Sequence, residues 1–441
     1  MVERKTKRLM RHEVPEELTW NLQDLFVDDK AWEAELAALE QDIATVKQYQ
    51  GSLGESAKTL AACLKALETY NERLFKANAY ASLLQSGDGA SPANQEKAAL
   101  AMALSAKVSA EFAFVQSEIA ALPDELARQY LEDPALEDYI KFVNDILETK
   151  PHRLAPETEE VLAALREVHS APEMIYQRTK AADMDFEPIQ DHDGEEMPMS
   201  FALYEDLYES MPDTELRRKA AASFTKTLKR YQNTFAGTYG TEVKKQVLLS
   251  KIRRYNSVTE MLLQPQQVTE EMYHNQLDII QKELAPHMRR YARLKKEQLG
   301  LDKMVFCDLK AQLDPENDPK ITFAEARELI LDALKVLGSE YLEIIAEGLY
   351  NRWVDLADNV GKSTGAFCLS IYGLHPYILL TWTDNMRSAF VLVHELGHAG
   401  HFALAMKYNN LLNLRPSTYL VEAPSTMNEL LLGNHILSQT D

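Results

Sequence analysis

Apolar residues recur at helical intervals through most of this chain. Near the N-terminus they fall three or four positions apart, at Trp32, Leu36, Leu39, Ile43 and Val46. Such spacing puts the apolar side chains on one face of an α-helix, which has to be buried against other helices. Only 16 glycines and 17 prolines interrupt 441 residues, so long helices are allowed. The sequence therefore predicts a mainly α fold.

Local signals set the ends of several helices. Ser56 can cap a helix that runs to Gly87, and Ser91-Pro92 opens the next, because proline is favoured at the first helical position. The capping-box pair Thr322 and Glu325 begins another. Further helices are expected at about 124–147, 156–169, 201–211, 213–253 and 269–299, the last kinked at Pro286.

Two regions have an extended pattern instead. The turn dipeptide Asp193-Gly194 predicts a short hairpin within 183–199. Segments 365–372 and 376–382 are predicted strands, followed by a helix from about 385 to 407. We therefore expect an N-terminal helical domain, residues 1–200, and a second domain, residues 201–441, in which a small β-sheet lies beside a helix.

Charge and cysteine content limit the possible partners. The formal net charge is −21, which opposes binding to nucleic acid or to anionic membranes. Cys63, Cys307 and Cys368 are few and far apart, as expected for free thiols in a reducing compartment. The charged N-terminal segment does not look like a secretion signal, and no run of about 18 apolar residues is present. These features predict a soluble, cytoplasmic protein.

The sequence His-Glu-Leu-Gly-His, residues 394–398, lies within the predicted helix 385–407. Positions i and i+4 leave the same face of a helix, so His394 and His398 can bind one ion. Glu395 lies at the margin of that face, where its carboxylate can take a proton from water on the metal. The motif predicts a metal-dependent hydrolase with Zn2+ as the ion, although such a site can also accept Mn2+ or Co2+.

A catalytic zinc needs a third protein ligand. Leu404 stands where one known pattern has a third histidine, and His401 is better suited to packing or to supporting a ligand. Glu422 is favoured as the third ligand because Pro424 fits the first turn of a new helix. Glu429 is the alternative, but its position suits a carboxylate that orients a ligating imidazole.

These residues belong to a wider resemblance. The chain resembles oligoendopeptidase F, of the thimet oligopeptidase family, along essentially its whole length. The matching segments are WNLQDLF (20–26), SVTEMLL (257–263), GAFCLSIYG (365–373), HPYILL (375–380), HELGHAGH (394–401) and VEAPSTMNELLL (421–432). Matched by position, the resemblance implies that His394, His398 and Glu422 hold one zinc ion and that Glu395 is the base.

The resemblance also implies a multi-helical shell around a deep channel that admits short peptides and cleaves their internal bonds. The strand residues Gly365, Ala366 and Phe367 would line the substrate. Tyr372 and His375 would border the channel, unless they serve core packing or support of the turn.

In one respect the sequence departs from that family. Members continue well past the E-A-P-S segment, with a histidine and tyrosines that stabilise the oxyanion, whereas this sequence ends at Asp441. Loss of one such donor costs about 10²–10³ in rate. We therefore expect a truncated chain, in which a C-terminal segment or a second chain would cover the apolar run 430–437. The alternatives to an active endopeptidase are an impaired fragment that binds zinc and peptide, and a helical interaction protein without metal.

Overall fold

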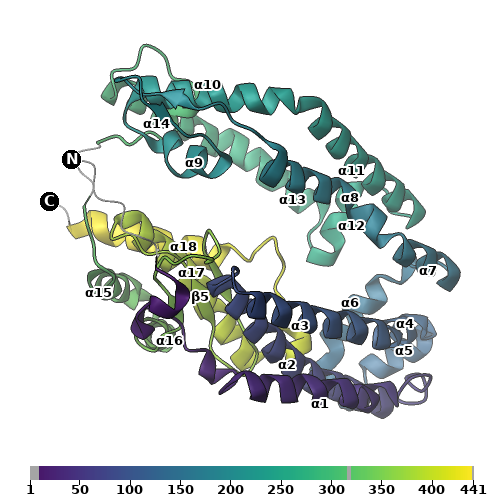
Figure 1. Ribbon diagram of the computed structural model, residues 1–441. Helices are drawn as coiled ribbons and strands as arrows, with labels where there is room; N and C mark the ends of the chain where they lie inside the picture. The colour runs from purple at the N-terminus through teal and green to yellow at the C-terminus, as the bar shows by residue number, and fades with distance from the viewer. Residues whose placement is uncertain (1–8, 315–318, 440–441) are drawn as a thin grey trace. The chain divides into compact units, whose positions relative to one another are not determined.

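The computed structural model describes residues 9–314 and 319–439. Within that part of the chain the structure is mainly helical with few strands, as predicted (Figure 1). It forms two compact units: a first unit made of Met1–Lys150 with Pro319–Asp441, and a second unit, Pro151–Asp318. This division differs from the expected boundary after residue 200, because the N-terminal helices share a unit with the C-terminal part of the chain.

The N-terminal helices of the first unit surround one apolar core. Trp32, Leu39, Leu60, Leu64 and Val115 are among its buried residues. Asp28, Ser56 and Ser91 cap the first three helices, so two of the sequence signals named above mark real helix starts. The helices are α1 (Asp29–Lys47), α2 (Ala57–Gly87), α3 (Pro92–Glu111), α4 (Ala113–Ala121), α5 (Asp124–Leu131) and α6 (Ile140–Glu148).

The C-terminal helices of the first unit form a second core around the sheet. Ile330, Ile345, Ile378, Leu396 and Leu432 are buried in it. The predicted capping box of Thr322 and Glu325 begins the first of these helices. They are α15 (Phe323–Leu334), α16 (Ser339–Tyr350), α17 (Met386–Tyr408) and α18 (Ala423–Gln439).

A three-stranded sheet has the order β3-β5-β4. Strand β4 (Phe367–Leu369) pairs antiparallel with β5 (Tyr377–Leu379), which confirms the predicted strand pair in shorter form. Strand β3 (Val354–Asp355) adds a parallel partner on the other side of β5 and was not predicted. Strand β4 therefore lies at an edge of the sheet.

Residues from opposite ends of the chain meet at this sheet. The buried side chains of Trp20, Leu83, Ile371 and Tyr377 form one cluster. The backbone N–H of Leu356 donates to the carbonyl of Leu18 at 2.9 Å. These contacts explain why the N-terminal segment folds with the C-terminal part.

The second unit consists of helices and one small hairpin. Strands β1 (Ile189–Gln190) and β2 (Glu196–Met197) pair antiparallel, as predicted for 183–199. The predicted helix 213–253 is broken at Tyr231, and a π-helical turn at 280–284 precedes Pro286. The helices are α7 (Pro156–Ala164), α8 (Arg166–Arg178), α9 (Phe201–Asp206), α10 (Thr214–Arg230), α11 (Gln232–Ile252), α12 (Val258–Leu263), α13 (Glu270–Ile279) and α14 (Ala285–Gln298).

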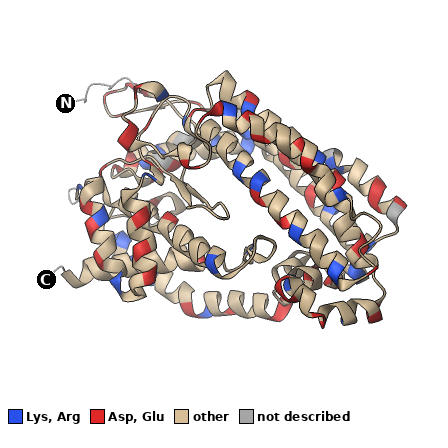
Figure 2. Cartoon of the chain, turned by 90° about the horizontal axis from the view of Figure 1, so that it is seen from below, with Lys and Arg blue, Asp and Glu red and all other residues tan. Residues whose placement is uncertain are grey.

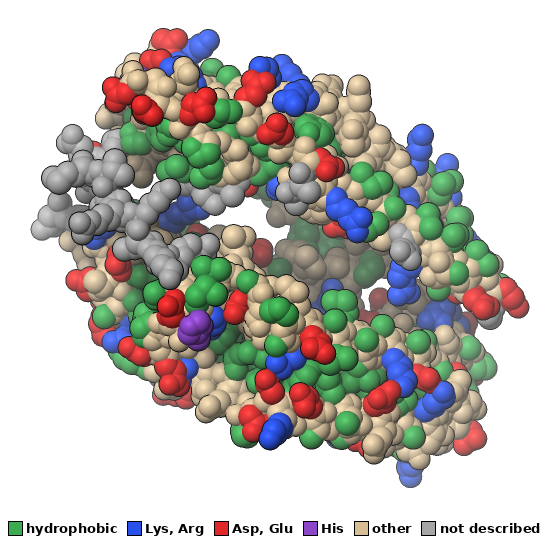
Figure 3. Space-filling model, in the orientation of Figure 1, with side chains coloured by type: hydrophobic (Ala, Val, Ile, Leu, Met, Phe, Trp, Pro, Cys, Tyr) green, Lys and Arg blue, Asp and Glu red, His purple; other side chains and the backbone are tan. Residues whose placement is uncertain are grey.

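One helical stretch could cross a membrane by its length and composition alone, namely Pro92–Ala121. Its residues Val108, Phe114 and Ile119 pack in the apolar core of the first unit, and the core helix of a soluble protein passes the same test. Other apolar side chains of the stretch, such as Leu100 and Met102, are exposed. Figure 3 shows hydrophobic and charged side chains interspersed on the visible face of the molecule. The stretch is therefore only a weak indication of a membrane span.

Acidic and basic side chains are also interspersed along the helices (Figure 2). Many of them form ion pairs one turn apart, for example Lys141 with Asp145 and Lys219 with Glu215. In this view the net charge of −21 is spread over the helices and is not gathered in one tract.

Candidate metal centre

Helix α17 carries the His-Glu-Leu-Gly-His motif. The Asn385 side chain accepts from the N–H of Ser388 at 2.9 Å and so caps its start. Leu392, Val393 and Leu396 bury one face of the helix in the core. The opposite face presents the rings of His394 and His398, whose centroids lie 5.0 Å apart.

Helix α18 approaches α17 closely, and one glycine makes this possible. A Cβ atom placed on Gly397 would lie 2.5 Å from Cα of Ser425 and 2.8 Å from its backbone nitrogen. Real side chains do not tolerate such distances to backbone, so the contact requires glycine at this position. The carbonyl of Glu422 accepts the N–H of Thr426 at 3.0 Å, which places Glu422 at the start of α18, facing the motif.

Three predicted ligands converge at this point. The Oε2 atom of Glu422 lies 3.3 Å from Nε2 of His394 and 3.2 Å from Nε2 of His398. The three donor atoms lie within 4.8 Å of one another. Ligands bound at about 2.0–2.1 Å around a tetrahedral zinc ion are about 3.4 Å apart, so these separations fit the ion.

The protonation of the His398 ring agrees with this fit. Burial lowers the pKa of His398, against the opposing effect of the Glu422 carboxylate, so the ring tends to be neutral. A neutral imidazole has one N–H and one lone pair, and it binds a metal through the lone pair. The set of two imidazoles and one carboxylate, with the Glu422 side chain 63% exposed, can hold a divalent ion and leave room for water.

A second carboxylate contacts the far side of one ring. Oε1 of Glu429 lies 2.6 Å from Nδ1 of His394. If Nδ1 carries the proton and donates it to Glu429, Nε2 keeps the lone pair that a metal needs. The structure therefore brings Glu429 to the ligand His394 and not into the group of three donor atoms.

Glu395 is buried beside this group, with 6% of its surface exposed. Burial raises the pKa of Glu395 to about 7; the His394 ring opposes this rise and the Glu422 carboxylate adds to it.

On the adjacent edge strand, burial also raises the pKa of Cys368, so the Cys368 thiol stays protonated near neutral pH. A low-pKa nucleophilic thiol is therefore not part of this site.

His401 lies on α17 outside the group of three donors. Burial lowers its pKa, and its ring lies 5.3 Å from that of Phe402. Among the residues that the structure describes, Nδ1 of His401 and Nδ1 of His398 have no hydrogen-bond partner. The contacts of His401 are those of a packed side chain.

The predicted substrate-lining residues fall into two sets. Phe367 is in the edge strand β4, and Gly365 and Ala366 lead into it. His375 instead stacks on Trp353 at 4.8 Å, and its Nε2 lies 3.1 Å from a carboxylate oxygen of Asp24. These contacts favour the turn-support role for His375.

Tyr372 is held by the chain beyond α17. Its hydroxyl donates to the carbonyl of Asn409 at 3.2 Å, and burial raises its pKa. The bond joins the loop after β4 to the end of the motif helix. This contact favours a supporting role over a place at the channel border.

Several supporting residues were not predicted. Ser425 and Asn428 on α18 and Tyr341 on α16 are in contact with the motif helix or with the candidate ligand Glu422. The serine of the E-A-P-S segment, three residues after Glu422, is the signal that could have pointed to Ser425. Asn428 and Tyr341 come together only through the tertiary fold.

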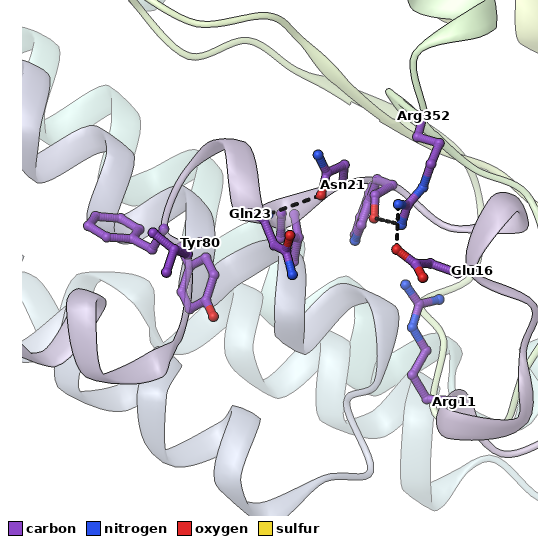
Figure 4. A pocket seen from close by; sticks show the side chains of 10 residues that line it. Arg11, Glu16, Asn21, Gln23, Tyr80 and Arg352 are labelled. Carbon is purple, nitrogen blue, oxygen red and sulfur yellow. Dashed lines mark hydrogen bonds and ion pairs between the residues drawn. The ribbon is translucent and has the colours of Figure 1, made fainter.

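A cavity of about 290 Å³ lies elsewhere in the first unit (Figure 4). It is bordered by Arg11, Glu16, Asn21, Tyr80 and Arg352 among others, and none of the candidate ligands lines it. Its arginines are engaged: Arg352 pairs with Glu16 at 2.7 Å, and Arg11 donates to Asp355. The cavity is therefore separate from the metal centre.

Comparison with known proteins identifies the family of this chain. The model of "Peptidase family M3" matches residues 207–440, and that of "Oligopeptidase F" matches residues 118–186. The first match alone covers more than half of the chain, and it includes the motif helix and α18. The chain belongs to peptidase family M3. The resemblance to oligoendopeptidase F is thereby confirmed.

Individual relatives cover nearly all of this chain. It is 33% identical over 432 residues to Oligopeptidase PepF of Bacillus subtilis, a match that covers 98% of this chain and 64% of the relative. It is 30% identical to Group B oligopeptidase PepB of Streptococcus agalactiae, covering 97% of this chain and 71% of the relative. A crystal structure from Chlamydophila abortus is similar with a TM-score of 0.85 and 27% identity, over 99% of this chain and 73% of the other. The chain thus spans about two thirds of the length of these relatives.

Proposed function

We propose that this protein is a zinc-dependent endopeptidase that hydrolyses internal bonds of short peptides. The observation that carries the proposal is the position of one Glu422 oxygen, 3.2 Å and 3.3 Å from the Nε2 atoms of His398 and His394. Membership of peptidase family M3 supports the reaction class. The relatives named oligopeptidases support short peptides as substrates.

The residues of the chain divide the chemistry among them. His394, His398 and Glu422 would hold one Zn2+, which when bound acts as a Lewis acid and makes water more acidic. Glu395 takes a proton from the attacking water and passes it to the leaving amine nitrogen. Glu429 holds the His394 ring through Nδ1.

The edge strand supplies a way to align the substrate. Within the described part of the chain, β4 pairs with β5 on one side and with no strand on the other, so an extended peptide can add to that open side through backbone hydrogen bonds. Phe367 and the preceding Gly365 and Ala366 would then line the peptide. Recognition through backbone suits an enzyme that acts on many short sequences.

Substitution Glu395→Gln tests the assignment of the base. The variant should keep one zinc per chain by elemental analysis and lose about 10²–10⁴-fold in cleavage of a quenched fluorescent peptide. His398→Ala should lose the zinc as well, which separates the base from the ligands. Unchanged cleavage by Glu395→Gln would rule out its role as base.

A second candidate function is a protein that binds zinc and peptide with little turnover. Peptide binding by fluorescence anisotropy with a zinc-loaded sample, together with absent cleavage at stoichiometric enzyme, would select it. If the isolated protein releases Mn2+ or Co2+ instead of Zn2+, the assignment of zinc as the native ion is wrong. The cytoplasmic location stays a prediction, for which cell fractionation is the test.

A further inference from the structure

Ser425 is a buried polar residue in the first turn of α18, with no exposed surface. Its hydroxyl lies 2.9 Å from the backbone carbonyl of Glu422 and 2.8 Å from Oε2 of the same residue. The bond to the carbonyl would satisfy the hydroxyl as an ordinary helix-end contact. The bond to Oε2 is different, because Oε2 is the atom that lies nearest both histidine rings.

We propose that Ser425 is a positioning residue for the metal ligand Glu422, a role that rests on the zinc site proposed above. A carboxylate oxygen has enough lone pairs to accept the Ser425 hydroxyl and to bind an ion at the same time. A hydroxyl donates more strongly to a carboxylate than to a neutral carbonyl. The bond therefore holds Oε2 toward His394 and His398 before an ion arrives.

Glu422 needs such a restraint more than the two histidines do. Its side chain is 63% exposed, whereas the His394 and His398 side chains are 30% and 12% exposed. An exposed glutamate has several rotamers, and binding an ion through it costs the entropy of choosing one. A fixed hydroxyl lowers that cost because the carboxylate is already in place.

Ser425 is itself held by contacts with the motif helix. Its Cα lies against Gly397. One turn later, the buried Asn428 side chain donates to the carbonyl of Val393 at 3.3 Å and to the hydroxyl of Tyr341 at 2.9 Å. We call Gly397, Ser425, Asn428 and Tyr341 the helix latch. Because Val393 precedes His394 directly, the latch fixes the serine relative to the histidine ligands.

Zinc affinity, measured by chelator competition on the full chain, tests the proposal. Ser425→Ala should weaken zinc binding about 10–100-fold, as loss of a group that orients a ligand typically does. Thr426→Ala removes a hydroxyl from the next, exposed position and should leave the affinity unchanged. Ser425→Cys keeps the side-chain size and replaces the hydroxyl by a weak donor, so it should resemble Ser425→Ala.

A double-mutant cycle separates positioning from mere structural support. In the background Glu422→Ala there is no carboxylate to hold, so adding Ser425→Ala should cause little further loss of zinc affinity. Equal losses in both backgrounds, or wild-type affinity for Ser425→Ala, would overturn the proposal. If the alanine variant does not fold, the same cycle with Ser425→Cys decides.

The result also distinguishes this proposal from the proposed function. A wild-type protein that binds no zinc, or whose affinity does not change with Glu422→Ala, would refute the metal site itself. If the wild type binds zinc and Glu422→Ala weakens that binding, the metal site stands. Wild-type zinc affinity in the Ser425 variants would then refute the positioning role alone.

Discussion

Two clusters of ionisable side chains in this protein have opposite character. In the second unit, the buried Asp308 carboxylate accepts from Arg217 at 2.7 Å and from Arg218 at 2.9 Å. Its oxygens are satisfied by donors of opposite charge. In the first unit, Oε2 of Glu422 instead faces the imidazoles of His394 and His398, and burial lowers the pKa of His398.

The difference lies in what each cluster lacks. The Asp308 cluster brings together two guanidinium groups and two carboxylates, because Arg218 also pairs with Asp302 at 3.0 Å, and its charges compensate one another within the protein. The Glu422 cluster brings together atoms that are all able to accept, and a cation would complete it. A cluster of ionisable residues therefore indicates a cation site when its acceptors converge without a positively charged side chain such as arginine.

Removing the buried carboxylate of the Asp308 cluster should have the largest effect on stability. Asp308→Ala leaves the buried Arg217 without its partner and should lower the free energy of unfolding by about 3–5 kcal/mol. Urea denaturation monitored by circular dichroism measures the change. The folded variant should still bind one zinc ion, since His394, His398 and Glu422 all lie in the first unit. Loss of zinc from the folded variant would contradict the separation of the two clusters.

A side chain added at the contact between α17 and α18 should disturb the Glu422 cluster. Gly397→Ala puts a methyl group against the backbone of Ser425, and overpacking of this kind costs about 1–3 kcal/mol. Because α18 must move, we expect weaker zinc binding together with the lower stability. Gly433→Ala is the matched control, since its Cβ would meet only Phe390 at an ordinary 3.8 Å. Equal zinc affinities for the two variants would show that the contact does not position Glu422.

The carboxylate behind His394 should have a more selective effect. Glu429→Gln keeps the size of the side chain but removes the charge that holds the proton on Nδ1 of His394. Zinc affinity should fall about 10–100-fold, with little change in the thermal unfolding of the metal-free protein. Isothermal titration and differential scanning calorimetry measure the two quantities. An unchanged affinity would assign Glu429 to packing alone.

The sequence predicted the parts of this site that depend on local spacing. The two histidines and Glu395 share one helix, and a capping box began another helix where expected. The close approach of Gly397 to Ser425 was not predictable, because it depends on how two helices pack. Strand β3 was missed because two residues give no periodic pattern, and its strand character comes from pairing with β5.

The division of the chain was also beyond the reach of local patterns. A boundary after residue 200 follows the order of the sequence, whereas Leu18 pairs with Leu356 and Trp20 shares a core with Tyr377. Such contacts join residues more than three hundred positions apart. The Asp308 cluster is of the same kind, since Arg217 lies 91 residues away from it. Contacts of this range are set by the fold and leave no repeat in the sequence.

The pH dependence of stability should show the smallest of these effects, and it tests the charge of Asp308 directly. Burial alone would raise the pKa of Asp308, but the bonds from Arg218 and Arg217 outweigh it and hold the pKa below the ordinary value. A carboxyl with a lowered pKa stabilises the fold above its unfolded pKa of about 3.9 and loses that contribution as pH falls toward the folded value.

Between the folded and the unfolded pKa of Asp308, the unfolded chain therefore binds up to one more proton at this carboxyl than the folded chain does. That single proton contributes about 1.4 kcal/mol per pH unit to the slope of stability against pH. The asparagine of Asp308→Asn cannot bind this proton. Urea denaturation at several pH values between 3 and 4 should therefore show a shallower slope of the free energy of unfolding against pH in this variant, by up to about 1.4 kcal/mol per pH unit. Identical slopes would mean that the pKa of Asp308 is the same in the folded and in the unfolded chain, so that the two arginines do not stabilise its charge.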